Sequence, residues 1–286
     1  MHSFRDMKIG KKLILLLAMP IIALLSFSTQ AIFDKAGEAE TMASLQEVSQ
    51  LAVHISALVH ETQKERGASA LYLGSKGQKF GPELQAQRVE TDKRLDELQS
   101  FLTGFAVQDY SEELRISLEQ ATRQLLDLDQ TRRASDGLSA SSGAIIGYYT
   151  GVNASLIEII STMAKISDQA ELLLRISAYV NFLESKERAG IERAVLSNTF
   201  ARDAFGPGML NKFINLVADQ GTFGKVFQRF ATQAQKKAFL AKMDHPAVAE
   251  TERMRQVAME RPATGGFGIE APAWFARQTE KINLLK

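Results

Sequence analysis

The stretch LAVHISALVHETQKERGASALYL, residues 51–73, decides the fold class. Its apolar and small residues recur at spacings of three, four or seven, as on the buried face of a helix: Leu51, Ile55, Leu58, Thr62, Ser69 and Leu73. Alternating β-branched runs, which would indicate strands, are scarce along the rest of the chain. The sequence therefore predicts an all-α protein.

Glycine and proline clusters divide the chain after Lys35 into about eight helices. Two predicted helices, residues 34–73 and 164–202, are much longer than the ~11 residues of an average globular helix. The shorter segments between them, and three more after Gly206, are available to pack around each long helix. We expect long antiparallel helices arranged in stacked bundles.

The first 34 residues have the pattern of a membrane anchor. An apolar stretch from Leu13 to Phe33 is about as long as the ~20 residues that span a bilayer. It follows four basic residues, Arg5, Lys8, Lys11 and Lys12. The positive-inside rule then places the N-terminus in the cytoplasm and Asp34 onward outside it, in the periplasm of a bacterium. We expect an anchor in residues 1–34 and a periplasmic domain in residues 35–286.

A cleaved signal peptide is the alternative for this segment. The densest apolar run covers only residues 13–25, and Thr29-Gln30-Ala31 resembles a small-residue cleavage site. Either interpretation predicts export of the rest of the chain to the periplasm, and the anchor adds attachment to the inner membrane.

Composition excludes several kinds of site. The chain has 34 basic and 33 acidic residues and no long block of like charge, so we expect no nucleic-acid partner. It has no cysteine, and its four histidines are not at metal-ligand spacings, so we expect neither a metal nor another cofactor. No nucleophile with its base, and no paired acid and base, is visible, which argues against an enzyme.

Arg66 lies on the buried face of the first long helix. At 100° per residue it falls about 80° from Leu58, inside the apolar arc. Its neighbours at 67–70 are small, which leaves room for a ligand beside the guanidinium. The alternative is a structural salt bridge with Glu61, Glu65 or a group on a partner helix.

The second long helix repeats this chemistry at residues 184–193, ESKERAGIER. The helical period turns Arg193 toward the face of Glu187 and Gly190, and turns Arg188 away from it. Two arginines that met between helices would repel each other unless an anion or carboxylates lay between them. A guanidinium fork suits a planar oxyanion, to which it donates two parallel hydrogen bonds.

At these residues the chain resembles the nitrate- and nitrite-sensing domain of bacterial chemoreceptors, sensor kinases and antiterminators. The resemblance rests on QKERGAS at 63–69 and KERAGIER at 186–193, with weaker matches near Gln87 and Trp274. It implies two four-helix bundles that hold nitrate or nitrite between helices, and a homodimer. The ligand-binding candidates are Arg66, Arg193, Ser69 and a third arginine, Arg253 in preference to Arg255.

The predicted span favours a membrane receptor, and among those a methyl-accepting chemotaxis receptor. The amphipathic run at residues 274–285 looks like a helix returning to the membrane, so we expect a fragment cut before a second span. The alternatives are a sensor of another small anion and a helical scaffold without a small-molecule ligand.

Overall fold

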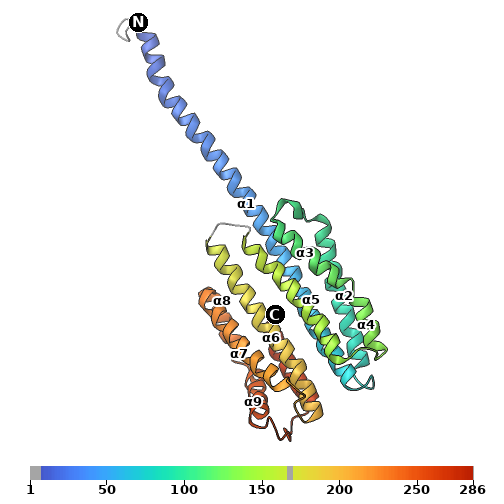
Figure 1. Ribbon diagram of the computed structural model, residues 1–286. Helices are drawn as coiled ribbons and strands as arrows, with labels where there is room; N and C mark the ends of the chain where they lie inside the picture. Colours follow the sequence, from blue (N-terminus) through green and yellow to red (C-terminus); the bar gives the residue numbers. More distant parts are fainter. Residues whose placement is uncertain (1–7, 166–169, 286) are drawn as a thin grey trace. The chain divides into compact units, whose positions relative to one another are not determined.

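The structure is a computed structural model that describes residues 8–165 and 170–285. Throughout these residues the regular structure is helical, which confirms the all-α prediction (Figure 1). The α-helices are α1 Ile9–Gly74, α2 Gly81–Gly104, α3 Glu112–Leu125, α4 Leu128–Asp136, α5 Ser142–Thr162, α6 Ala170–Arg202, α7 Met209–Phe230, α8 Gln233–Met243, α9 Pro246–Glu260 and α10 Ala271–Leu284. The described residues also include two short 3-10 helices, η2 Val107–Asp109 and η3 Met163–Lys165.

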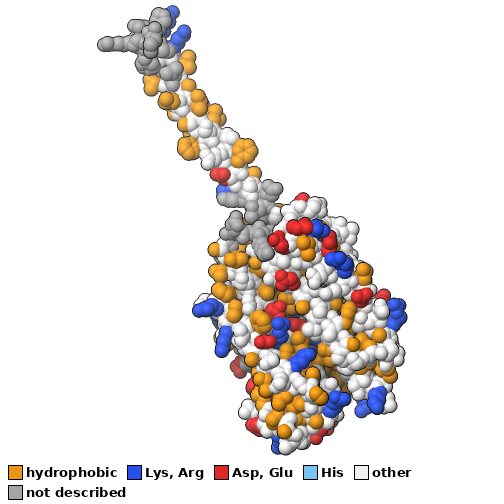
Figure 2. Space-filling model, in the orientation of Figure 1, with side chains coloured by type: hydrophobic (Ala, Val, Ile, Leu, Met, Phe, Trp, Pro, Cys, Tyr) orange, Lys and Arg blue, Asp and Glu red, His pale blue; other side chains and the backbone are white. Residues whose placement is uncertain are grey.

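The chain divides into two units, Met1–Gln50 and Leu51–Lys286. In the first unit α1 carries large apolar side chains that face solvent, as the orange side chains in Figure 2 show; Leu16 is 67% exposed and Phe27 is 74% exposed. Within the described residues two helices are long and apolar enough to cross a membrane, judged by length and composition alone. They are α1, with a mean hydropathy of 2.1 over its best window, and α5, with 1.2.

In the second unit the two longest helices run in the same direction. Three passes of chain separate residues 51–74 of α1 from α6: α2 returns, α3 and α4 run forward again, and α5 returns (Figure 1). Residues later in α1 contact residues later in α6: Gln63 contacts Glu187, and Gly67 contacts Arg193. The expectation of antiparallel long helices is therefore wrong for this pair, because an odd number of passes lies between them.

An apolar core of this unit lies among α6, α7, α9 and α10. At its centre Trp274 is fully buried, with Phe200 edge-on at 5.8 Å between ring centroids. The indole nitrogen of Trp274 donates a hydrogen bond of 3.0 Å to the backbone carbonyl of Arg193. Burial of an aromatic side chain with a satisfied polar group is strongly stabilising, so Trp274 fixes α10 against the middle of α6.

We predict that Trp274→Ala lowers the free energy of unfolding by about 3–5 kcal/mol, because it leaves a cavity in the core. Urea denaturation followed by circular dichroism measures the loss. The control is Leu240→Ala on α8, where the leucine is 60% exposed and the change should stay within about 0.5 kcal/mol. Equal effects of the two substitutions would contradict this account of the core.

Candidate functional site

The candidate site is the contact between α1 and α6, where two arginines cross. Arg66 and Arg193 are both fully buried. A Cβ on Gly190 would lie 2.7 Å from Nη2 of Arg66, and a Cβ on Gly67 would lie 3.1 Å from Nη2 of Arg193 and 2.8 Å from the ring of Phe275. Each arginine therefore lies across a glycine of the other helix, so close that a methyl group at either glycine would require the facing side chain to shift.

Arg66 forms a buried ion pair with Glu187. Its Nη1 donates to Oε1 of Glu187, and its Nη2 lies 3.2 Å from Oε2. Nη1 also donates to the hydroxyl of Thr150 at 3.0 Å. The same carboxylate accepts hydrogen bonds from the side-chain amides of Gln63, at 2.7 Å, and Asn153, at 3.2 Å. The pair is thus closely hydrogen-bonded, as a buried salt bridge requires.

Arg193 has no such carboxylate among the residues that the structure describes. Its Nη2 donates to the backbone carbonyl of Gln63 at 2.7 Å, and its Nη1 donates to the hydroxyl of Thr279 at 2.9 Å. The guanidinium carbon lies 4.9 Å from the centre of the Phe275 ring, within range of a cation–π interaction. These neutral partners orient the guanidinium without neutralising its charge.

The pKa of Arg193 reflects the lack, among the described residues, of a carboxylate that accepts a hydrogen bond from it. Burial, and after it the like charge of Arg66, lower the pKa of Arg193 to about 9, while Glu187 acts in the opposite direction. A lowered pKa means that the charged form is disfavoured in the fold. An anion bound nearby would relieve this cost.

Three buried donors on these stretches of α1 and α6 have no acceptor within the described part of the chain. They are Nε of Arg66, Nε of Arg193 and the hydroxyl of Ser69, which is 1% exposed. Buried polar groups in native proteins nearly always have a hydrogen-bond partner. The arrangement is therefore one that an oxyanion could complete.

The arginines of α9 are placed differently from our expectation. Arg253 faces solvent and pairs with Glu250 at 2.7 Å, because residues two apart on a helix point to opposite sides. Arg255 is buried and binds both carboxylate oxygens of Glu192, at 2.5 and 2.6 Å. Arg253 is thus exposed, whereas Arg255 is the buried arginine of α9 and pairs with the residue that precedes Arg193 in the sequence.

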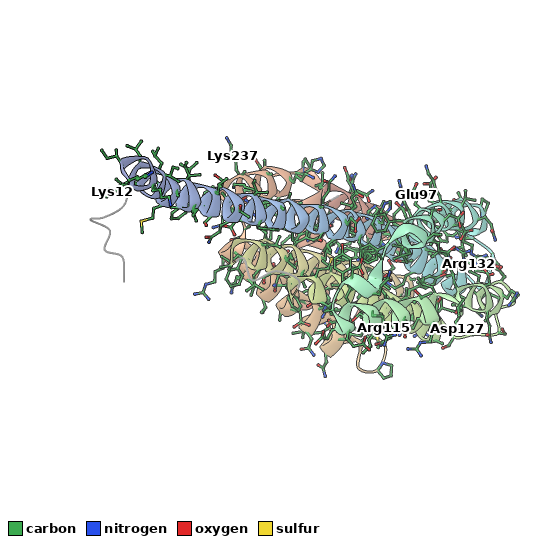
Figure 3. The ribbon with its side chains drawn as sticks, turned by 90° about the horizontal axis from the view of Figure 1, so that it is seen from above. Lys12, Glu97, Arg115, Asp127, Arg132 and Lys237 are labelled. Atoms are coloured by element: carbon green, nitrogen blue, oxygen red, sulfur yellow. The ribbon has the colours of Figure 1, made fainter. Side chains whose placement is uncertain are left out.

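Glu65 does not balance Arg66, although the sequence allowed that pairing. It accepts hydrogen bonds of 2.8 and 3.0 Å from Arg132 of α4, which is labelled in Figure 3, and one of 2.7 Å from the hydroxyl of Tyr149. Sequence reasoning missed this second buried network. No local spacing links Arg132 or Tyr149 to Glu65, since the three residues come from different helices.

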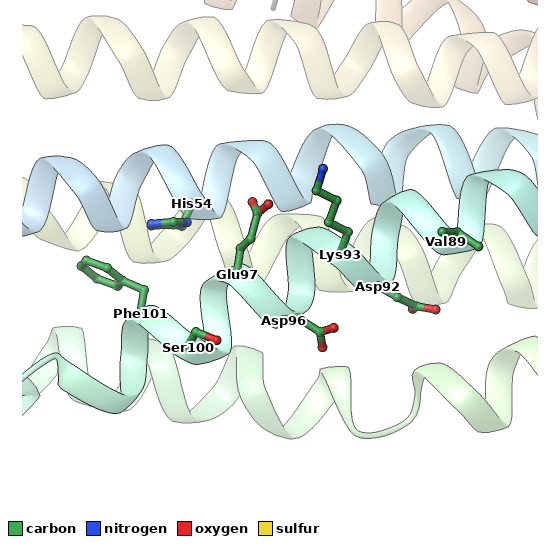
Figure 4. Close-up of a pocket in the computed structure, with 8 residues that line it drawn as sticks. All are labelled: His54, Val89, Asp92, Lys93, Asp96, Glu97, Ser100 and Phe101. Carbon is green, nitrogen blue, oxygen red and sulfur yellow. The ribbon is translucent and has the colours of Figure 1, made fainter.

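A shallow groove between α1 and α2 is a poor alternative site for an anion (Figure 4). Its charged lining is mostly acidic, with Asp92, Asp96 and Glu97 against Lys93. At its end His54 and Phe101 lie 5.0 Å apart between ring centroids. The negative lining would repel an anion.

Comparison with known proteins gives three results. The family described as nitrate and nitrite sensing matches residues 57–286. A nitrate regulatory protein of Klebsiella oxytoca is 28% identical over 82% of this chain, and the chain spans 59% of that relative. The solved structure of the NasR transcription antiterminator is 27% identical with a TM-score of 0.78; the match covers 86% of this chain and 66% of that one.

These relatives correct the expected class of protein. They are described as a nitrate regulatory protein and a transcription antiterminator, which contradicts the interpretation as the periplasmic sensor of a chemotaxis receptor in the bacterial inner membrane. That interpretation came from hydropathy and flanking charge. Such patterns indicate only that a helix could cross a bilayer, and they carry no information about the kind of protein to which it belongs.

The exclusion of a nucleic-acid partner is contradicted as well, because one relative is a transcription antiterminator. The exclusion rested on the near-zero net charge of this chain. The chain spans only 59% and 66% of the two relatives, so its charge does not report on the remainder of either protein.

We predict that Gly190→Ala lowers the free energy of unfolding by about 1–3 kcal/mol, since its methyl group displaces Arg66 from Glu187. Urea denaturation of the full chain in mild detergent measures the change. The matched control is Gly221→Ala on α7, where a Cβ meets no atom within 4 Å. That variant should be as stable as the wild type, or more stable by up to about 1 kcal/mol. Stabilisation by both substitutions would contradict the close packing at Gly190.

Proposed function

We propose, since the chain belongs to the nitrate and nitrite sensing family, that residues 51–286 bind nitrate or nitrite between α1 and α6. In this proposal Arg66, Arg193 and Ser69 contact the anion, and Arg255 supports Arg193 from the adjoining network. Binding would control a regulatory output, as the descriptions of the two relatives suggest.

The observation that carries the proposal is the buried positive charge of Arg193. Among the described residues, two guanidinium groups and one carboxylate, that of Glu187, meet at the crossing of α1 and α6, so one positive charge remains. An isolated buried charge is costly unless it is paired. One monovalent anion would neutralise it.

The same charge balance favours nitrate or nitrite over sulfate. A divalent anion would overcompensate the single positive charge. It would leave one uncompensated negative charge in a site that excludes water. The unpaired donors on Arg66, Arg193 and Ser69 can serve separate oxygens of a planar anion, whereas chloride offers a single acceptor atom. We therefore propose selection by charge first and by shape second.

The arrangement of helices supports a finer description of the fold. We propose one four-helix bundle of residues 51–74, α2, α3 with α4, and α5, and a second of α6, α7, α8 with α9, and α10. The packing of α6 on α7 and α10, and of α3 on α5, agrees with this division.

We also propose that residues 1–34 form an anchor of membrane-spanning length and that residues 35–286 form the sensing part. The exposed apolar surface of α1 supports the anchor.

We predict that calorimetric titration of the full chain in mild detergent gives saturable binding of nitrate or nitrite at constant ionic strength, and no binding of sulfate. Arg193→Met should abolish this binding. It should leave the free energy of unfolding without ligand unchanged or higher, because it removes an unpaired buried charge.

We further predict that Arg66→Met lowers the free energy of unfolding by about 3–5 kcal/mol, because it leaves Glu187 buried and unpaired. Adding Glu187→Gln to Arg66→Met should recover most of that loss. Urea denaturation measures both effects. If neither nitrate nor nitrite binds the wild type, and Arg193→Met destabilises the fold as much as Arg66→Met, both arginines are structural and the scaffold alternative holds.

A further inference from the structure

A cavity of about 800 Å³ opens where α1 and α6 end, beside the segment that precedes α10. Part of its wall is buried, at Ala194 and Ser197 of α6. The lining also includes three exposed basic residues: Lys76, Lys79 and Arg202. The cavity therefore connects solvent with the interior of the domain.

The buried wall begins one helical turn beyond the paired arginines, which do not themselves line the cavity. On α1 the lining residue Ala70 follows Arg66 by one helical turn, and on α6 Ser197 follows Arg193 by one turn. Residues four apart on a helix share a face. The inner wall of the cavity is thus formed by the two faces that carry the guanidinium groups.

Ser197 is the polar residue at this inner wall. It is 3% exposed, and its hydroxyl has no hydrogen-bond partner among the described residues. A hydroxyl within a helix usually donates to the carbonyl one turn earlier, as Thr199 does to Val195 at 3.0 Å. Ser197 makes no such bond, so its hydroxyl is available to a ligand in the cavity.

The charges around the cavity favour an anion. Three basic side chains line it, against the two acidic residues Asp203 and Glu270. The carboxylate of Asp203 already accepts hydrogen bonds from the backbone amides of Gly266 and Phe267, at 3.0 and 2.9 Å. A cleft with an excess of positive charge raises the rate at which anions associate.

We propose that this cavity admits the anion to Arg66 and Arg193, and that Ser197 donates a hydrogen bond to the anion at the inner end. This proposal rests on the proposed function, and it adds an access route and a ligand-binding residue. It also assigns Lys76, Lys79 and Arg202 a role in attracting the anion.

The test is calorimetric titration of the full chain with nitrate, comparing Ser197→Ala with the wild type. Loss of a hydrogen bond to a charged ligand should weaken nitrate binding about tenfold or more, with an unchanged thermal midpoint in the absence of nitrate. The matched control is Ser135→Ala on α4, which removes another buried hydroxyl without a partner, outside the cavity. It should bind nitrate as the wild type does.

A kinetic measurement tests the access route separately. Lys76→Gln combined with Lys79→Gln should slow nitrate association in stopped-flow mixing at low salt, and leave the dissociation rate unchanged. Wild-type affinity in Ser197→Ala together with wild-type association in the lysine double variant would overturn this proposal while leaving the proposed function intact. Absence of nitrate binding by the wild type itself would overturn both.

Discussion

The crossing of Arg66 and Arg193 between α1 and α6 is the constraint on which the site depends. Each guanidinium fits because the opposing helix has a glycine at the point of contact, Gly190 for one and Gly67 for the other. Close approach of this kind needs a residue without a side chain. It also aligns two parallel helices that lie three passes apart in the chain.

This packing determines the electrostatics of the interior. Glu187 pairs with Arg66 and accepts hydrogen bonds from Gln63 and Asn153. The partners of Arg193 among the described residues are neutral. One guanidinium is therefore part of the permanent structure, and the other carries a charge that the fold orients without neutralising. Under the proposed function this asymmetry separates stability from binding, because the first arginine supports the helices and the second supplies the affinity.

Two further buried networks hold the elements that surround this contact. Glu65 joins α1 to α4 and α5 through Arg132 and Tyr149, and Glu192 joins α6 to α9 through Arg255. Trp274 then fixes α10 against α6 from the other side. In each network the carboxylate accepts hydrogen bonds from well-placed donors, which is the condition under which buried charges are tolerated. Among the described residues, no carboxylate accepts a hydrogen bond from Arg193 in this way, and the proposed function assigns its charge to the ligand.

The sequence by itself determined the helical class, the inward direction of Arg66 and Arg193, and the family, because helical periodicity and short motifs are local properties of the chain. Only the tertiary structure decided that Glu187 pairs with Arg66 while Glu65 pairs with Arg132. It also decided that Arg255 rather than Arg253 is buried, and that α1 and α6 run parallel. These features depend on which helices meet and in what direction, and helical periodicity specifies a face without naming the helix that will cover it.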